Sequence, residues 1–581
     1  MTISRRGLLK LAAAGGSLTV FGVGYKDMLQ KMVRDWRDHN PRVARALTGN
    51  APEPEFVVDR ATGAVNANPA QYVANTVCVG CTSLCGVRVR VDRASGQVIR
   101  VSGNPYHPLS ADPFLDYNTT IAESFRAVSA YGESGLQMRS TACGRGNAVL
   151  DKLYDPYRVL TPLKRVGRRG EGRWEPITFE QLITEIVEGG DLFGEGHVDG
   201  LRAIRDVETP IDPEQPELGP KSNQLVCLAG YPEGRIELMQ RFVLFSFGSI
   251  NLSGHRGNCG LTMRSAYASL LSDWAGQPHL KPDFRNAEFV LNIGTAPANA
   301  GNPFKRQGKL VAEARSEGAL TYVVVDPVLT NSDSIAVGDR SRWIPIIPGT
   351  DGALAMGMIR WIIENQRYNE NFLRQPNGAA AKNAGEPSWS NATHLVITKK
   401  DHPDFGKFLR GSQMGLVTLN ENKDNDTFMV AVNGQLFMHT EPTGPADLFF
   451  EGEVELGGET VNVRTAMSLL RDAAFEHTLA EYSEITGIPV SQIEGLAEEF
   501  TSHGRRAAAD CHGGTMHSNG FYSAWAVVML NAMIGNLNWK GGTSAGGGTW
   551  NAISPGPRYD LVQFAGRIQP SGAHQPLWYA L

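Results

Sequence analysis

A strand–helix–strand pattern in the middle of the chain limits the possible folds more than any other feature. An apolar strand at 288–293 is followed by a small-residue loop at 294–302, a helix pattern at 304–316 and a second apolar strand at 320–325. Two parallel strands need a crossover connection of this kind, and such crossovers are almost always right-handed. The pattern therefore predicts a doubly wound α/β core around a parallel sheet.

The pattern continues downstream with a strand at 343–347, a turn at 348–351 and a helix that carries apolar residues on one face. Further on, Asn433-Gly434 separates two short strand patterns, 428–432 and 435–439. Asn-Gly between alternating strands favours a type I′ hairpin turn. We therefore expect a hairpin within an elaborated surface between about 375 and 465.

Length and charge restrict the class of protein. The 581 residues suggest three or four domains of roughly 100–200 residues each. The formal net charge is −5 and no basic block occurs, so the sequence offers little to a nucleic-acid backbone. Seven cysteines are too few for a disulfide framework at this length, and an odd number cannot pair completely. We expect no nucleic-acid partner.

The N-terminus has the layout of an export signal. Arg5, Arg6 and Lys10 precede an uncharged stretch, 11–25, that is too short to span a bilayer comfortably. The motif resembles a twin-arginine signal, whose pathway exports folded proteins. This predicts a periplasmic protein loaded with its cofactor before export; the alternative is an amphipathic or disordered tail.

Four cysteines have the spacing of a metal centre. Cys78, Cys81 and Cys85 form a C-x2-C-x3-C cluster, and Cys143 follows much later in the chain. Three thiolates on one turn, with a fourth brought in by the fold, can hold a [4Fe–4S] cluster. Zinc and disulfides remain the alternatives, although zinc sites more often show paired C-x2-C knuckles.

A fifth cysteine lies in a polar, cation-rich loop, 253–264. A thiolate at Cys259 would suit a thiophilic metal, and the nearby His255 and Arg256 would favour its ionised form. The alternative is a structural cysteine in a loop. Cys511 could belong to the core or to the wall of a cofactor site.

Glycine-rich loops follow several of the predicted strands. They lie at 294–303, 348–354 and 513–520, and Asp326-Pro327 follows another strand. Small residues and free amides at the carboxyl end of a parallel sheet are where α/β folds bind dinucleotides. The loops lack G-x-G-x-x-G, so NAD is disfavoured. Each loop alone is a weak signal, since glycine turns before helices are common.

Taken together, the twin-arginine start, the C-x2-C-x3-C cluster, the later C-G-R-G around Cys143 and the glycine loops resemble the catalytic subunits of molybdopterin oxidoreductases, the dimethyl sulfoxide reductase family. The resemblance runs from about Thr76 to Thr543. It implies a [4Fe–4S] cluster and one molybdenum chelated as bis(molybdopterin guanine dinucleotide), with Cys259 as the protein ligand. The gap before Cys143 is longer than is common in the family, and Val328 stands where the family often has Arg.

The resemblance also implies roles for further residues. Arg145 would lie between the cluster and a pterin, and Asp326 would accept hydrogen bonds from guanine. The residues expected to contact the cofactor are Arg145, Gly294, Asn299, Asn302, Asp326, Thr330, Gly349, Thr350, Asp351, His517 and Asn519.

The cationic loop indicates the substrate. His255, Arg256 and Arg264 would offer charge-assisted donors to a dianion near the metal; the alternative is charge balance around the pterin pyrophosphates. The loop is most similar to that of the tetrathionate-reducing branch of the family, which implies two partners: an iron–sulfur electron-transfer subunit, plus a membrane quinol-oxidising subunit. Arsenate, selenate or another sulfur oxyanion is the alternative substrate, and a non-catalytic electron-transfer or scaffold subunit is the alternative of a different class.

We therefore expect an α/β protein with a small N-terminal iron–sulfur domain, doubly wound parallel-sheet domains of which one is inserted in the other, and no C-terminal cap domain. A longer form of this chain or another polypeptide would supply the cap domain that the family has. The expected segments are a signal at 1–25, an extension at 26–71, a [4Fe–4S] domain at 72–175, an α/β domain binding pterin dinucleotide at 176–258 plus 350–551, an inserted Rossmann-like domain at 259–349, and a tail at 552–581.

Overall fold

A computed structural model gives the fold of the chain. It describes residues 54–80, 84–111, 113–129, 131, 140–229, 236–254, 260–274, 279–297, 306–329, 340–517, 519–546 and 561–572. The chain divides into two compact units, Met1–Gly200 and Leu201–Leu581. The expected signal at 1–25 lies outside the described residues, as does the extension as far as residue 53.

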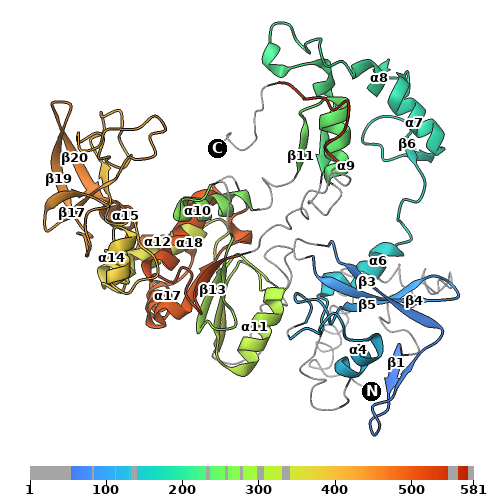
Figure 1. The fold of residues 1–581 in the computed structure, drawn as a ribbon, viewed down its shortest axis with the longest axis horizontal. Coiled ribbons are helices and arrows are strands. Elements are labelled where there is room, and N and C mark those ends of the chain that lie inside the picture. Colours follow the sequence, from blue (N-terminus) through green and yellow to red (C-terminus); the bar gives the residue numbers. More distant parts are fainter. Residues whose placement is uncertain are drawn as a thin grey trace, which may run out of the picture. The chain divides into compact units, whose positions relative to one another are not determined.

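The first unit is built on an antiparallel sheet (Figure 1). Its strands β3 (Gln71–Val77), β4 (Gly86–Asp92) and β5 (Val98–Gly103) pair in that order. Two short helices, α5 (Gly144–Asn147) and α6 (Val149–Leu153), pack against β5. The segment that begins at Cys143 is therefore held against the sheet whose central strand, β4, directly follows Cys85. The other elements here are β1 (Phe56–Val58), β2 (Val65–Ala67) and α4 (Ile121–Val128).

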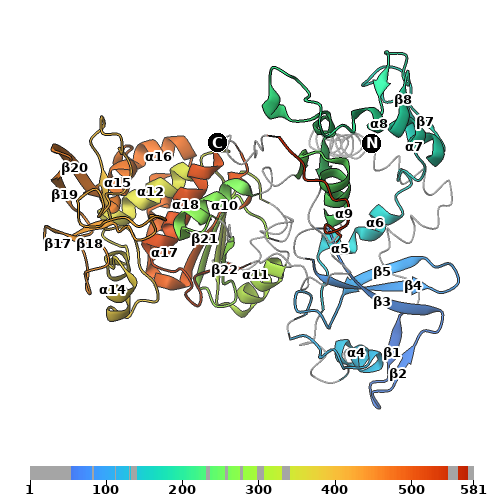
Figure 2. The same cartoon turned by 45° about the horizontal axis from the view of Figure 1, so that its top comes forward.

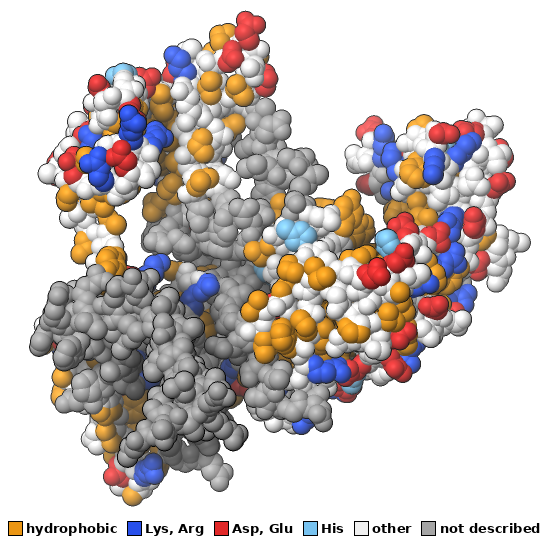
Figure 3. Space-filling model, turned by 180° about the vertical axis from the view of Figure 1, so that it is seen from behind, with side chains coloured by type: hydrophobic (Ala, Val, Ile, Leu, Met, Phe, Trp, Pro, Cys, Tyr) orange, Lys and Arg blue, Asp and Glu red, His pale blue; other side chains and the backbone are white. Residues whose placement is uncertain are grey.

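The unit ends in a segment with exposed apolar side chains. It contains β6 (Leu163–Arg165), β7 (Trp174–Pro176), α7 (Phe179–Glu188), β8 (Gly189–Gly190) and β9 (Val198–Asp199). The hydroxyl of Thr178 accepts a hydrogen bond from the backbone N–H of Gln181 and so caps the N-terminus of α7. No residue of α7 is buried, and Phe179 is 62% exposed. On the face drawn in Figure 3, acidic and basic side chains are interspersed.

The second unit contains the predicted parallel sheet. Its order is β15-β14-β13-β21, and all three pairings are parallel. The strands are β13 (Phe289–Ile293), β14 (Thr321–Val325), β15 (Ser341–Ile344) and β21 (Ala507–Asp510). The strand–helix–strand prediction is confirmed, while β15 begins two residues earlier than expected and ends at Ile344 rather than at 347.

Helices cover both faces of this sheet. They are α10 (Leu261–Leu271), α11 (Arg306–Glu317), α12 (Asp351–Glu364), α17 (Val490–Ser502) and α18 (Gly520–Met533). Leu291 and Ile293 belong to a core shared with α10, α12 and α18, whereas Val290 belongs to a second core with α11. Figures 1 and 2 show α11 on the opposite side of the sheet from these helices. Alternation along the strand thus produces the doubly wound arrangement.

The sheet unites segments that the sequence assigns to two domains. β21 comes from 350–551, yet it pairs with β13 from 259–349, with Leu291 opposite Ala509. Strand order depends on long-range pairing that a local pattern does not encode. The compact units divide the chain after residue 200, and the domain boundaries stay a prediction.

An elaborated region follows α12. It contains α13 (Glu370–Leu373), α14 (Gly378–Asn383), β16 (Leu395–Ile397), β17 (Met429–Val432), β18 (Gln435–Met438), β19 (Glu451–Leu456), β20 (Glu459–Thr465), α15 (Ala466–Phe475) and α16 (Leu479–Thr486). β17 and β18 form the predicted hairpin, with Asn433 at φ 51° and Gly434 at φ 78°. Both values are positive, as a type I′ turn requires.

Residues 201–254 form a further part of the second unit. It contains α8 (Leu201–Ile204), β10 (Cys227–Ala229), α9 (Ile236–Gln240) and β11 (Leu252–Gly254). Residues 561–572 of the expected tail pack here: the N–H of Ile568 donates to the carbonyl of Phe245 at 2.9 Å. Among the described residues, no helix is long and apolar enough to cross a bilayer.

Candidate functional site

Two glycine loops meet at the carboxyl edge of the parallel sheet. Gly294 follows β13 and has φ +58°, and a Cβ on it would lie 2.5 Å from the Cα of Gly514, which follows β21. A Cβ on Gly513 would lie 2.3 Å from the carbonyl oxygen of Gly294. Only glycine permits this approach of backbone to backbone. The two loops therefore form one continuous surface of main-chain atoms.

Asp351 lies against this surface at the start of α12. Its Oδ1 would be 2.8 Å from a Cβ on Gly514, and its side chain is buried. Burial raises the pKa of Asp351, while His517 lowers it and Asp326 raises it. Asp326, Asp351 and His517, all expected cofactor residues, therefore lie close enough to interact electrostatically.

Thr295 supplies a buried polar atom next to Gly294. Its side chain is 2% exposed, and its hydroxyl oxygen has no hydrogen-bond partner within the part of the chain that the structure describes. A buried hydroxyl without a partner costs free energy unless something else binds it. This atom and the glycine surface fit a ligand at the sheet edge.

A buried ion pair supports the loop after β21. Asp510 accepts hydrogen bonds from Lys281 Nζ at 3.0 and 3.1 Å, from the Tyr267 hydroxyl at 3.2 Å and from the N–H of Cys511 at 3.0 Å. Lys281 belongs to β12 (His279–Pro282), and β12 pairs with β22 (Thr543–Gly546). Burial raises the pKa of the Cys511 thiol, which keeps it protonated.

Arg264 is held by a histidine. On α10, its Nε donates to Nε2 of His279 at 2.5 Å, and His279 is 2% exposed. The His279 ring stacks on that of His512, with the centroids 6.4 Å apart. Burial, followed by Arg264, Lys281 and His512, lowers the pKa of His279 to about 2.

The cysteine turn lies in the first unit. The N–H of Cys78 donates to the carbonyl of Cys85 at 2.9 Å, and Leu84 between them has φ 48°. Arg145 Nη1 donates to the carbonyl of Gly80 at 3.0 Å, which ties the Cys143 segment to this turn. Cys78 and Cys143 are free thiols.

Cys81 lies outside the described residues. Among those that are described, no group of three or more His, Cys, Asp or Glu side chains is placed to hold a metal ion.

The remaining described residues of the predicted set lie next to Asp351 or His517 in the chain. Gly349 is exposed with φ +82°, the Thr350 hydroxyl donates to the carbonyl of Ile347 at 2.7 Å, and Asn519 is exposed before α18. The expected site residues outside the described part of the chain are His255, Arg256, Cys259, Asn299, Asn302 and Thr330.

Sequence reasoning missed several residues at this edge, namely His279, Lys281, Thr295, Asp510 and His512. The sequence carried no local signal for Lys281, because the burial that makes this lysine need a charged partner is seen only in the structure.

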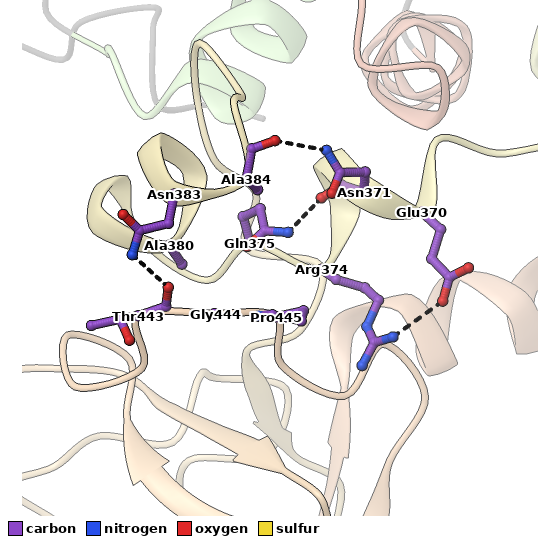
Figure 4. Close-up of a pocket in the computed structure, with 10 residues that line it drawn as sticks. All are labelled: Glu370, Asn371, Arg374, Gln375, Ala380, Asn383, Ala384, Thr443, Gly444 and Pro445. Atoms are coloured by element: carbon purple, nitrogen blue, oxygen red, sulfur yellow. Dashed lines mark hydrogen bonds and ion pairs between the residues drawn. The ribbon is translucent and has the colours of Figure 1, made fainter.

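A cavity of about 510 Å³ lies elsewhere, between α13, α14 and the turn 443–445 (Figure 4). Polar groups in its wall bond to other residues of the wall: Asn383 Nδ2 donates to the carbonyl of Thr443 at 2.9 Å, and Gln375 Nε2 donates to the carbonyl of Asn371 at 2.7 Å. None of the expected site residues lines it, so it is separate from the sheet-edge site.

Residues 228–567 match the family model described as molybdopterin oxidoreductase. The chain is 47% identical over 573 residues to a tetrathionate reductase subunit of Salmonella typhimurium, covering 98% of this chain and 55% of that protein. It is 35% identical to a selenate reductase subunit of Mesobacillus selenatarsenatis, with coverages of 83% and 48%. It is 30% identical to a tetrathionate reductase subunit of Archaeoglobus fulgidus, with coverages of 93% and 50%. The chain spans about half the length of these relatives.

Proposed function

Because the chain belongs to the molybdopterin oxidoreductase family, we propose that it is the catalytic part of a molybdenum-dependent tetrathionate reductase. The observation that carries this proposal is the 47% identity to the Salmonella tetrathionate reductase subunit over 98% of the chain. The 35% identity to a selenate reductase makes selenate the second candidate substrate. The remaining alternatives are arsenate, another sulfur oxyanion and the role of a non-catalytic electron-transfer subunit.

The sheet edge fits a pterin dinucleotide. The close approach of Gly294 to Gly513 and Gly514 leaves main-chain atoms uncovered by side chains, and Thr295 has a buried hydroxyl for a polar ligand. Backbone amides at such an edge bind phosphate groups. In this proposal Asp326 accepts hydrogen bonds from the guanine base, and Asp351 and His517 flank the same surface. The other proposed contacts are Asn299, Asn302, Thr330, Gly349, Thr350 and Asn519.

The cysteine turn is proposed to hold a [4Fe–4S] cluster. Cys78, Cys81, Cys85 and Cys143 would supply the four thiolates, and support comes from the bond that joins Arg145 to the carbonyl of Gly80. A fixed cation beside the cluster would stabilise an added electron. Export by the twin-arginine pathway to the periplasm, an iron–sulfur partner and a membrane quinol-oxidising partner belong to the same proposal.

The reaction consumes two electrons. Tetrathionate accepts them, its central S–S bond breaks, and two thiosulfate ions leave. Bound molybdenum would exchange these electrons with the substrate, with Cys259 as its protein ligand. His255, Arg256 and Arg264 would bind the dianion by charge-assisted hydrogen bonds. The thiolate of this chain would thus bind the metal, and its cations would bind the substrate.

Oxidation of a reduced viologen dye by the complete holoenzyme tests the proposal. We expect turnover with tetrathionate to exceed that with selenate and arsenate, and two thiosulfates to form per tetrathionate. Cys259→Ala should abolish turnover and keep the iron content. Cys227→Ala, at a half-buried cysteine in β10, is the matched control and should keep activity. Faster turnover with selenate would make selenate the proposed substrate in place of tetrathionate. A holoenzyme without molybdenum would support the non-catalytic alternative.

A further inference from the structure

We propose that His279 is a positioning residue that orients the guanidinium of Arg264 for binding an oxyanion. This inference rests on the proposed function, since it concerns the same substrate site. Nothing in the sequence pattern around His279 indicates such a role, and the contact between α10 and β12 carries the inference.

The hydrogen bond fixes the plane of the guanidinium. Arg264 Nε donates to His279 Nε2 at 2.5 Å. Because the guanidinium is planar and rigid, holding Nε also sets the direction of the two terminal nitrogens. A fork of this kind binds two oxygens of an oxyanion at once, provided that its orientation is right. An oxyanion bound by Arg264 would be contacted through that fork, since the bond to His279 uses Nε.

The acceptor must be a neutral histidine. Arginine has only donors, so Nε2 of His279 has to accept, which requires the tautomer with its proton on Nδ1. Burial and the cations around it, which are Arg264 and Lys281, hold the pKa of His279 at about 2. The contact therefore does not lose its acceptor at the pH at which an enzyme works.

Buried elements hold the histidine itself. His279 begins β12, and two residues later Lys281 forms the buried ion pair with Asp510. His512 stacks on the His279 ring, and its Cε1 would lie 3.2 Å from a Cβ on Gly260. Gly260 directly follows Cys259. The contacts that hold the Arg264 cation therefore extend from the buried ion pair to Gly260, the residue after the proposed molybdenum ligand.

Binding measurements without a reductant separate this role from simple space filling. The probe is tetrathionate, titrated into the oxidised complete holoenzyme by calorimetry. His279→Leu removes the acceptor at similar volume, and we expect the Kd to rise about tenfold. His279→Gln restores an acceptor and should stay within about threefold of the wild type. His394→Leu, at another buried histidine far along the chain, is the matched control and should not change the Kd.

A double variant tests whether the effect passes through Arg264. In an Arg264→Lys background, His279→Leu should weaken binding by less than about twofold, because there is no guanidinium left to orient. An equal loss in both backgrounds, or wild-type binding by His279→Leu, would overturn the proposal. Molybdenum content and thermal unfolding are measured for each variant, and His279→Met replaces His279→Leu if the latter does not fold.

The outcomes also separate this inference from the proposed function. If the Kd values of the variants for tetrathionate follow the predicted order but the enzyme does not reduce tetrathionate, the proposed reductase function is wrong and the positioning role stands. Normal reduction with unaltered binding in His279→Leu would sink only the positioning role. A holoenzyme that binds neither tetrathionate nor selenate would overturn both.

Discussion

Lys281 Nζ lies 3.0 Å from Asp510 Oδ1, and both side chains are buried. The pair joins β12 to the end of β21, immediately before the glycine surface of the candidate site. Desolvating two charges is costly, and their attraction offsets that cost only while both are present. The loop that contains Gly513 and Gly514 therefore depends on an ion pair between segments about 230 residues apart in the chain.

We expect Lys281→Met to destabilise the protein by about 3–5 kcal/mol, because it leaves the charge of Asp510 buried without its partner. Thermal and urea unfolding would measure the loss. Lys407→Met removes the cation of an exposed pair with Asp404 and should cost much less, because water and salt screen exposed ion pairs. Equal effects of the two substitutions would contradict the assignment of a buried pair.

Gly294→Ala should reduce the amount of bound pterin. The new methyl would lie 2.5 Å from the Cα of Gly514, so the two loops would have to separate. Gly385→Ala is the control, since Gly385 also has a positive φ but a Cβ added there would have no atom within 4 Å. Both variants should lose roughly 1–2 kcal/mol from backbone strain, but only Gly294→Ala should release pterin, assayed by its fluorescence after oxidation. A full pterin content in Gly294→Ala would contradict the proposed binding of pterin at the surface that the two glycine loops form.

His394 should make stability depend on pH between 6.5 and 4. Burial, with smaller effects from His439 and Arg410, lowers its pKa from 6.5 to about 4. In this window the unfolded chain binds the proton and the folded chain does not, so stability is fully present above pH 6.5 and decreases as the pH falls. The decrease reaches up to about 3 kcal/mol.

His394→Gln removes this titration and can still donate to the carbonyl of Pro376, which lies 3.1 Å from His394 Nε2. Urea unfolding at pH 7 and pH 4.5 would compare the two proteins. The variant should lose less stability than the wild type between these pH values, and parallel losses would show that His394 is not the titrating group.

Leu84 should tolerate glycine better than valine. Its φ of 48° lies in the left-handed region, which glycine adopts readily and β-branched residues adopt rarely. Leu84→Gly should retain the iron and acid-labile sulfide of the purified protein, whereas Leu84→Val should lose part of both. Leu109→Val, at a leucine of the same unit that is absent from the positive-φ residues, controls for the change in side-chain volume. An equal iron content in all three variants would show that the positive φ of residue 84 does not limit which side chains this turn accepts.

Local patterns predicted individual elements well. The spacing of apolar residues and the small-residue loop around Gly294 predicted β13, α11 and β14, and Asn433-Gly434 predicted the hairpin. These features depend on contacts between residues close in sequence, so the chain itself carries their signal. For the candidate site, the sequence predicted Gly294, Asp326, Asp351 and His517, which interact at one edge.

By itself, the sequence determined the parallel α/β core, the glycine loops at the ends of its strands and the four-cysteine spacing. Only the tertiary structure decided that β21 lies beside β13, that Lys281 neutralises Asp510, and that His279 holds Arg264. The reason is physical: helix and strand patterns arise from side-chain periodicity along a few turns or residues. Pairings between distant segments are instead selected by burial and charge compensation in the folded chain, where every alternative partner competes.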